Sequence, residues 1–438
     1  MTPWPSFREA LSFWLKLGFI SFGGPAGQIA IMHEYLVDKK KWISESRFLH
    51  ALNYCMLLPG PEAQQLAIYT GWLLHGIRGG LVAGILFVLP SMFILILLSV
   101  IYVTLGSIPW VAALFYGLKP AVVAIVLLAL LKIGKRSLKH FVHFILATLS
   151  FIAIFFFKIS FPIIMVVTVV ISIALYFFSP IFKNVTSKNS TISDADEKEY
   201  VINNIDRSKW AELNPRQLLR ITVIALLLWA IPLTSIYASS MDISFWDSLI
   251  KFFSKAALVT FGGAYAVLPY VAQVAVEQFH WLEKVQMIDG LALGETTPGP
   301  LVMVLSFVGF MAGYNHFDHS IWFGVLALII TTYYTFLPCF LFIFVGAPII
   351  ERTQKNQNTK NILELISSSV VGVILNLAVY LGITILFPGK VIMSDLDFIS
   401  LAWIIISLIM LYRFKWNIIA WIGISALYGL LIHFIQLY

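Results

Sequence analysis

The stretches Ser21-Phe22-Gly23-Gly24-Pro25 and Leu58-Pro59-Gly60-Pro61-Glu62 set the architecture of this chain. Each lies between two short apolar segments, 7–20 and 25–37 for the first and 45–58 and 63–74 for the second. Glycine frees the backbone dihedrals, and proline cannot continue a helix. Both stretches are therefore predicted to break helices, in segments too short to span a membrane alone.

The same landmarks recur further along the chain. Lys16, Phe22-Gly23-Gly24, Trp42 and Pro59-Gly60-Pro61 correspond to residues 239 positions later, namely Lys255, Phe261-Gly262-Gly263, Trp281 and Pro298-Gly299-Pro300. Beyond them, Leu89-Pro90 and Val122-Val123 recur 248 positions later as Leu337-Pro338 and Val370-Val371. A shared offset over so many landmarks indicates an internal duplication, of roughly 7–180 in 245–437.

Composition places the duplication in a membrane. Of the 438 residues, 60% are hydrophobic and 12% are charged, whereas about 25% are charged in a soluble domain. Apolar runs of about 20 residues favour membrane helices over a β-barrel. These values exclude a soluble enzyme, a disordered chain and a nucleic-acid binder. The sequence therefore predicts an all-α, polytopic membrane protein.

A polar region divides the chain. We expect a first membrane repeat at 1–180, a cytoplasmic linker at 181–217, a connecting span with an external loop at 218–244, and a second repeat at 245–438. Basic residues dominate the loop 133–140 but not its counterpart 388–397, so the positive-inside rule favours a second copy in inverted orientation. The N-terminus is expected inside and the C-terminus outside.

Inverted repeats are typical of secondary transporters whose site lies near the membrane midplane. The alternative is an old gene fusion with no mechanistic role. Pro25, Pro61 and Pro300 are expected to begin half-helices, whose free N–H groups and positive dipole ends attract anions. Close packing of small residues is the alternative explanation for the breaks.

Several polar side chains flank the breaks. Lys16 and Lys255 are either a cationic wall for an anion or lysines that snorkel to an interface. Glu62 and Glu295 are expected to carry a proton in a partly dehydrated cavity, although Glu62 could instead pair with a nearby cation such as Lys119. The expected substrate-binding set is Lys16, Ser21, Phe22, Gly23, Gly24, Pro25, Gln28, Pro59, Gly60, Pro61, Gln65, Lys255, Thr260, Phe261, Gly262, Gly263, Thr296, Thr297, Pro298, Gly299 and Pro300.

No nucleotide-binding or hydrolase motif occurs, so we expect neither an enzyme nor a cofactor. Cys55 and Cys339 lie in apolar segments and form no metal motif, and the histidines lack metal-ligand spacing.

The motifs resemble those of the chromate ion transporter family. Phe22-Gly23-Gly24-Pro25 with Gln28, and Leu58-Pro59-Gly60-Pro61-Glu62, are similar to its first repeat. Thr260-Phe261-Gly262-Gly263 and Gly294-Glu295-Thr296-Thr297-Pro298-Gly299-Pro300 are similar to its second repeat. The chain resembles the long, two-repeat form. In the second copy Ala264, Val267 and Leu301 replace Pro25, Gln28 and Glu62, so the two halves are expected to contribute unequally.

The resemblance implies transport of chromate, with sulfate as its natural mimic, and efflux that gives chromate resistance. A passive anion channel, or a carrier of another oxyanion such as sulfate, remains the alternative. The expected partners are the oxyanion and membrane lipids, with no nucleic acid, and a homo-oligomer is compatible with the sequence.

Overall fold

The computed structural model describes residues 4–22, 24–56, 58–178, 199–202, 215–238, 242–261, 263–353 and 358–437. Gly23 and Gly262 of the expected site, and 181–198 and 203–214 of the expected linker, lie outside these residues. Within them the regular structure is helical, and one isolated bridge joins Ile43 to Ile202. Six helices in this part of the chain are long and apolar enough to cross a membrane. The predicted all-α polytopic membrane fold is confirmed.

The first half contains seven α-helices and one π-helical turn. They are α1 (Phe7–Ile20), α2 (Gly24–His33), η1 (Glu34–Lys39), α3 (Glu45–Cys55), α4 (Glu62–Leu105), α5 (Pro109–Ser137), α6 (Phe141–Phe155) and α7 (Phe161–Phe178). Helix α1 begins where the Ser6 hydroxyl accepts a hydrogen bond from the Glu9 backbone N–H. It ends at Ser21, directly before the first predicted break.

Helix α8 (Pro215–Ala238) connects the halves, and the second half repeats the order of the first. Its elements are α9 (Ile243–Val259), α10 (Ala264–Ala272), η4 (Gln273–Gln278), α11 (Lys284–Thr296), η5 (Leu301–Met303), α12 (Val304–His316), α13 (Ile321–Thr353), α14 (Asn358–Leu386), η6 (Met393–Asp395), α15 (Phe398–Tyr412) and α16 (Ile418–Leu437). The π-helical turns η1 and η4 begin 239 positions apart, and Lys41 and His280, also 239 apart, share a φ near +50°. The repetition thus extends to local backbone irregularities.

Helix α4 consists of two helical arms that fold back on each other. His75 and Gly76 have non-helical dihedrals, and a Cβ on Gly79 would lie 2.2 Å from the Gly71 carbonyl oxygen. The short arm 62–74 and the long arm 77–105 correspond to α12 and α13, which are separate helices joined by 317–320. The predicted short segment 63–74 is therefore present, as the arm of a helical hairpin.

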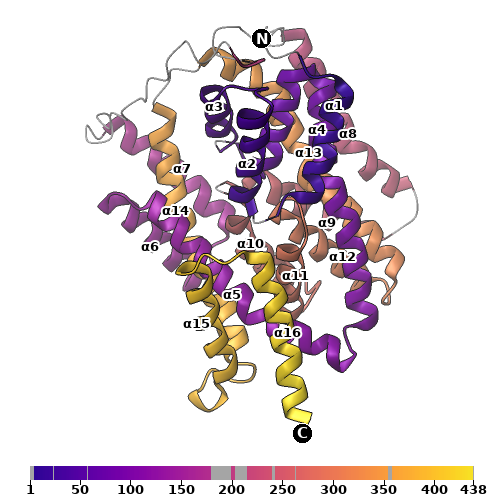
Figure 1. Ribbon diagram of the computed structural model, residues 1–438, viewed down its shortest axis with the longest axis vertical. Coiled ribbons are helices and arrows are strands. Elements are labelled where there is room, and N and C mark those ends of the chain that lie inside the picture. The colour runs from indigo at the N-terminus through magenta and orange to yellow at the C-terminus, as the bar shows by residue number, and fades with distance from the viewer. Residues whose placement is uncertain are drawn as a thin grey trace.

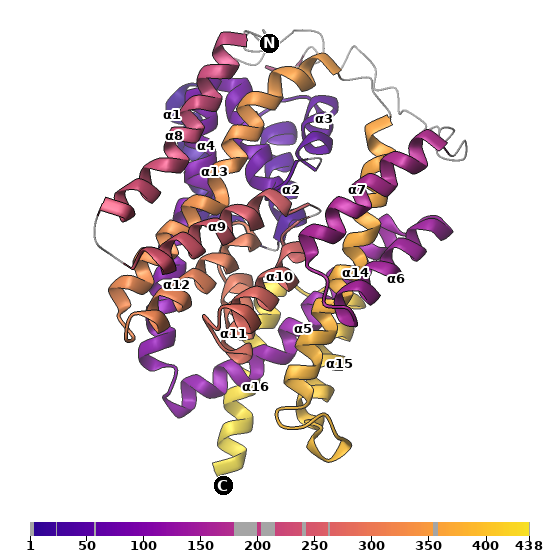
Figure 2. The ribbon, with the colours of Figure 1, turned by 180° about the vertical axis from the view of Figure 1, so that it is seen from behind.

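The halves exchange their last helices. Helix α5 packs against α15 and α16, while its counterpart α14 packs against α6 and α7. Figures 1 and 2 show the α6/α7 pair toward the end of the molecule where the N-terminus lies, and the α15/α16 pair toward the end where the C-terminus lies. Each half is therefore completed by helices of the other.

Helix α8 is held loosely. It packs against α9 and α13, and only 6% of its most apolar 18-residue window is buried. The part of the linker that the structure describes, 199–202, instead docks on the first half, where Ile202 N–H donates to the Trp42 carbonyl oxygen over 3.0 Å.

Candidate functional site

Two equivalent hydrogen bonds bring the breaks of both halves together. The Gly60 N–H donates to the Thr260 carbonyl oxygen, and the Gly299 N–H donates to the Ser21 carbonyl oxygen, each over 2.7 Å. Gly60 and Gly299 are 239 positions apart, and so are Ser21 and Thr260. The proline-glycine-proline loop of each half is thus bonded to the glycine break of the other half. We call this meeting point the crossing.

Glycine is required in the loops of the crossing. Gly60 has φ +120° and Gly299 has φ +95°, a region that side chains rarely adopt. A Cβ on Gly60 would lie 2.7 Å from Cys339 Sγ, and one on Gly299 would lie 1.7 Å from Ser91 Oγ. Ser91 also donates its hydroxyl hydrogen to the Pro298 carbonyl oxygen. Ser91 and Cys339 are 248 positions apart, so the second offset of the duplication could have identified these two contacts.

Helices begin at the breaks, as expected. Helix α2 starts at Gly24 with Pro25 in its first turn, and Pro61 and Pro300 directly precede α4 and η5. Helix α10 starts after Gly263. The first N–H groups of an α-helix have no partner within the helix, so these helix starts offer donors near the crossing.

Glu62 lies at the start of α10, in the other half of the molecule. Both of its carboxylate oxygens are 3.6 Å from the point where a Cβ on Gly263 would stand. The positive end of a helix dipole stabilises an anion at this place. In the described part of the chain, Glu62 has no ion pair with Lys16, Arg78 or Lys119. Lys119 instead pairs with Asp289, with 3.4 Å between Nζ and Oδ1.

Glu295 reaches the same helix end from α11. It is 8% exposed, and its Oε1 accepts a hydrogen bond of 2.6 Å from the Tyr265 hydroxyl, in the first turn of α10. Tyr265 could not be recognised by its repetition, because Ala26 stands at the equivalent place in the first half. Carboxyl groups of both halves therefore contact α10, Glu62 beside Gly263 and Glu295 through the Tyr265 hydroxyl.

Buried amide side chains brace the crossing. The Gln28 Nε2 donates to the Gly299 carbonyl oxygen over 2.5 Å and to the Ser21 carbonyl oxygen over 3.3 Å. The Gln65 Nε2 donates to the Pro59 carbonyl oxygen over 2.7 Å. Both amide oxygens and the Ser21 hydroxyl are buried without a hydrogen-bond partner. Buried polar atoms without a partner are rare in proteins, so the crossing has hydrogen-bonding groups that a ligand could use.

The threonines are engaged with their own helices. Thr260, Thr296 and Thr297 donate their hydroxyl hydrogens to the carbonyl oxygens of Ala256, Leu293 and Gly294. In this state the hydroxyls cannot also donate to an anion. Thr260 and Thr297 therefore contribute to the crossing through backbone and packing.

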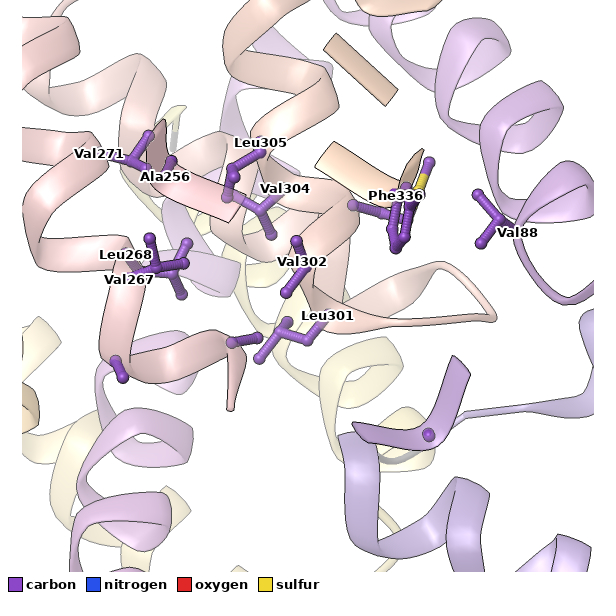
Figure 3. Packing of buried hydrophobic residues seen from close by; sticks show 14 of the residues in the cluster. Val88, Ala256, Val267, Leu268, Val271, Leu301, Val302, Val304, Leu305 and Phe336 are labelled. Atoms are coloured by element: carbon purple, nitrogen blue, oxygen red, sulfur yellow. The ribbon is translucent and has the colours of Figure 1, made fainter. Parts of the chain in front are cut away.

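The second half is apolar where the first is polar. Val267, Leu301 and Val304 stand at the places of Gln28, Glu62 and Gln65, and all three are buried. Figure 3 shows Val267 and Leu268 of α10 beside Leu301 and Val302 of η5 in the hydrophobic core. By contrast, a Cβ on Gly24 would meet nothing within 4 Å, so α2 begins beside open space. The halves are indeed unequal.

Lys16 and Lys255 do not belong to the crossing. Both are exposed, and Lys16 shares its face of α1 with the exposed apolar residues Leu15, Phe19 and Ile20. This placement fits lysines that snorkel along a lipid-facing surface and not a cationic wall. Phe22 and Phe261 are half-buried beside their breaks.

The described residues contain no group of three or more side chains placed to hold a metal ion. His316 pairs with Asp242 at 2.8 Å between Nε2 and Oδ2, and this contact lowers the pKa of the Asp242 carboxyl.

Comparisons with known proteins agree with the two halves. The sequence model of the family described as "Chromate transporter" matches residues 8–175 and again 248–430. No solved structure matches significantly.

Three relatives match most of the chain. An uncharacterized transporter of Methanocaldococcus jannaschii is 28% identical over 98% of this chain and 95% of its own length. Chromate transport proteins of Cupriavidus metallidurans and Pseudomonas aeruginosa are 26% and 28% identical, over 87% and 84% of this chain and 84% and 79% of their own lengths. The chain belongs to the chromate transporter family, a family of multi-pass plasma-membrane transporters and not of enzymes.

Proposed function

We propose that this protein is a secondary active transporter of chromate, or of a sulfate-like tetrahedral oxyanion, and that it exports its substrate and so gives chromate resistance. The observation that carries the proposal is the crossing, where equivalent hydrogen bonds join the breaks of both halves. The chromate transport proteins among its relatives supply the substrate.

The oxyanion binds where α2 begins. Open space lies beside Gly24, and the first N–H groups of α2 are free donors at a positive helix end. The Ser21 hydroxyl is buried without a partner next to this helix end and can donate a further hydrogen bond. The proposed site binds the anion with helix ends and a hydroxyl and without lysines. Its affinity is therefore moderate, which suits a transporter that must release its substrate.

Glu62 couples the anion to a proton. Its carboxylate lies at the N-terminus of α10, an environment that also favours an oxyanion. An anionic Glu62 therefore opposes a dianion at the crossing by charge repulsion, and protonation removes this repulsion. Glu295, which accepts a hydrogen bond from Tyr265 on the same helix, is the second proton carrier.

The two halves act as inverted repeats that rock about the crossing. The termini at opposite ends of the molecule and the paired hydrogen bonds at its centre support this view (Figure 1). Rocking of this kind exposes a fixed central site to each side in turn.

Glu62→Gln and Glu295→Gln test the coupling in proteoliposomes. Each coupled proton supports about tenfold accumulation per unit of pH gradient, because a factor of ten corresponds to about 1.4 kcal/mol. Glu62→Gln is expected to lose accumulation driven by a pH gradient and to keep chromate exchange at equal pH. Normal accumulation in both variants would remove the carboxyls from the mechanism.

A passive anion channel is the second candidate, favoured because neither Lys16 nor Lys255 lies at the crossing to hold an anion tightly. A channel gives flux that rises linearly with chromate and ignores a pH gradient. A sulfate carrier gives saturable sulfate flux that chromate inhibits.

A further inference from the structure

An apolar cavity lies away from the crossing, between α4, α8 and α13. Its volume is about 1000 Å³, and it is lined mostly by aliphatic and aromatic side chains such as Leu81, Val88, Ile224 and Phe340. The apolar side chains of this lining have no affinity for an oxyanion. Helix α8, which forms one wall, is scarcely buried by the rest of the protein, so the cavity borders the lipid phase.

Helix α8 contributes polar side chains to the cavity wall only near its N-terminal end. Arg216, Gln217 and Arg220 lie in the first two turns of α8, and the cavity wall continues along the same helix through Ile221 and Ile224 to Leu228. Figure 2 shows that α8 begins at the end of the molecule where the N-terminus lies. The side chains of Arg216 and Arg220 are both exposed.

The length of the cavity matches one leaflet of a bilayer. Arg216 and Leu228 are separated by about 18 Å along α8, from a rise of 1.5 Å per residue. Half of the hydrocarbon core of a bilayer is about 15 Å thick. The arginines stand where a lipid headgroup would lie, and the apolar part of the cavity is about as long as the acyl chains of one leaflet. The cavity therefore has the dimensions of a phospholipid.

We propose that this cavity binds an anionic phospholipid, whose phosphate contacts Arg216 and Arg220 and whose acyl chains lie against α4 and α13. Arginine binds phosphate through paired N–H donors, and a lipid with net negative charge gains more from two arginines than a zwitterionic lipid does. The lipid fills the gap that α8 leaves and fastens this helix to both halves.

The test uses the purified full-length protein in phosphatidylcholine nanodiscs that contain increasing fractions of phosphatidylglycerol. Retained phosphatidylglycerol is counted by native mass spectrometry, and thermal unfolding is followed in parallel. The wild type is expected to retain phosphatidylglycerol and to gain thermal stability. Arg216→Gln/Arg220→Gln is expected to bind it roughly tenfold more weakly or worse.

Two further variants separate the parts of the site. Ile224→Trp leaves the arginines intact and places a bulkier ring in the path of the acyl chains, so it is expected to weaken lipid binding while keeping the fold. Arg413→Gln/Lys415→Gln, in the distant loop between α15 and α16, is the matched charge control and is expected to behave as the wild type.

Three results would overturn the proposal. They are equal stabilisation by phosphatidylcholine alone, equal stabilisation by inorganic phosphate, or undiminished phosphatidylglycerol binding in both the arginine and Ile224→Trp variants. A fold defect in the arginine variant leaves Ile224→Trp and single Arg220→Gln to decide.

Discussion

Gly299 is the residue of the crossing with the least room. Its φ of +95° and the 1.7 Å between an added Cβ and Ser91 Oγ act together against any side chain. Gly24 has φ +68° but faces open space, so alanine there costs only the backbone strain of about 1–2 kcal/mol. Gly299→Ala is therefore expected to lower the thermal unfolding temperature clearly more than Gly24→Ala.

Ser91→Ala provides the control for this comparison, because it removes the oxygen that collides with the new Cβ. The double variant Gly299→Ala/Ser91→Ala should regain part of the lost stability. Equal unfolding temperatures for Gly299→Ala and Gly24→Ala would contradict the close contact between the halves.

Lys16→Gln and Lys255→Gln test the placement of the two lysines on exposed helix faces. Because neither side chain lies in the crossing, each variant should keep chromate flux within about twofold of the wild type at matched protein density. A flux reduced tenfold or more, with an unchanged unfolding temperature, would show that the lysines take part in substrate binding.

The sequence predicted the residues of the crossing better than their roles. The breaks, Gln28, Gln65 and Glu62 could be found, because helix-breaking and polar residues stand out against apolar segments. Tyr265 could not be singled out, because Ala26 stands at its equivalent place in the first half, whereas the 248-residue offset between Ser91 and Cys339 could have identified Ser91. The hydroxyls of Thr260 and Thr297 bond to their own helices, and no sequence pattern shows that choice.

At the scale of elements, the fold-back of α4 depends on two glycines. A Cβ on Gly79 would lie 2.2 Å from the Gly71 carbonyl oxygen, between two backbones that cannot separate without opening the hairpin. Gly79→Val is expected to reduce folded protein severely, measured as monodisperse yield by size-exclusion chromatography.

Gly423→Val is the matched control, because a Cβ on Gly423 in α16 meets nothing within 4 Å. It should leave the yield close to that of the wild type. A normal yield for Gly79→Val would show that the two arms of α4 lie further apart.

The bounds of the short helices α1 and α3 followed closely from the sequence, since apolar runs and helix breakers are local. The pairing of elements did not. That α5 packs against α15 and α16, and α14 against α6 and α7, depends on contacts between residues separated by most of the chain. Helical periodicity carries no information on such partners.

At the scale of the whole molecule, the inverted orientation that we propose for the halves makes a prediction about sidedness. Arg8, in the first turn of α1, and Met393, in η6 before α15, are both exposed. Figure 1 shows α1 toward the end where the N-terminus lies and α15 toward the end where the C-terminus lies. In intact cells, a membrane-impermeant maleimide should label Met393→Cys and should label Arg8→Cys only after permeabilisation.

The native Cys55 and Cys339 are buried and provide the unlabelled background. Labelling of both introduced cysteines from the same side would mean that the halves are parallel, and the rocking mechanism would lose its basis.

The duplication itself could be read from the sequence, because landmarks such as Trp42 and Trp281 keep one offset. The meeting of the two copies at one crossing needed the structure.

The most direct test of oxyanion transport is chromate flux into proteoliposomes of the purified wild-type protein under an imposed pH gradient, with sulfate as competitor. We expect saturable chromate flux that follows the pH gradient and is inhibited by sulfate. Absence of chromate flux, in vesicles that do transport another anion, would keep the architecture and contradict chromate as the substrate.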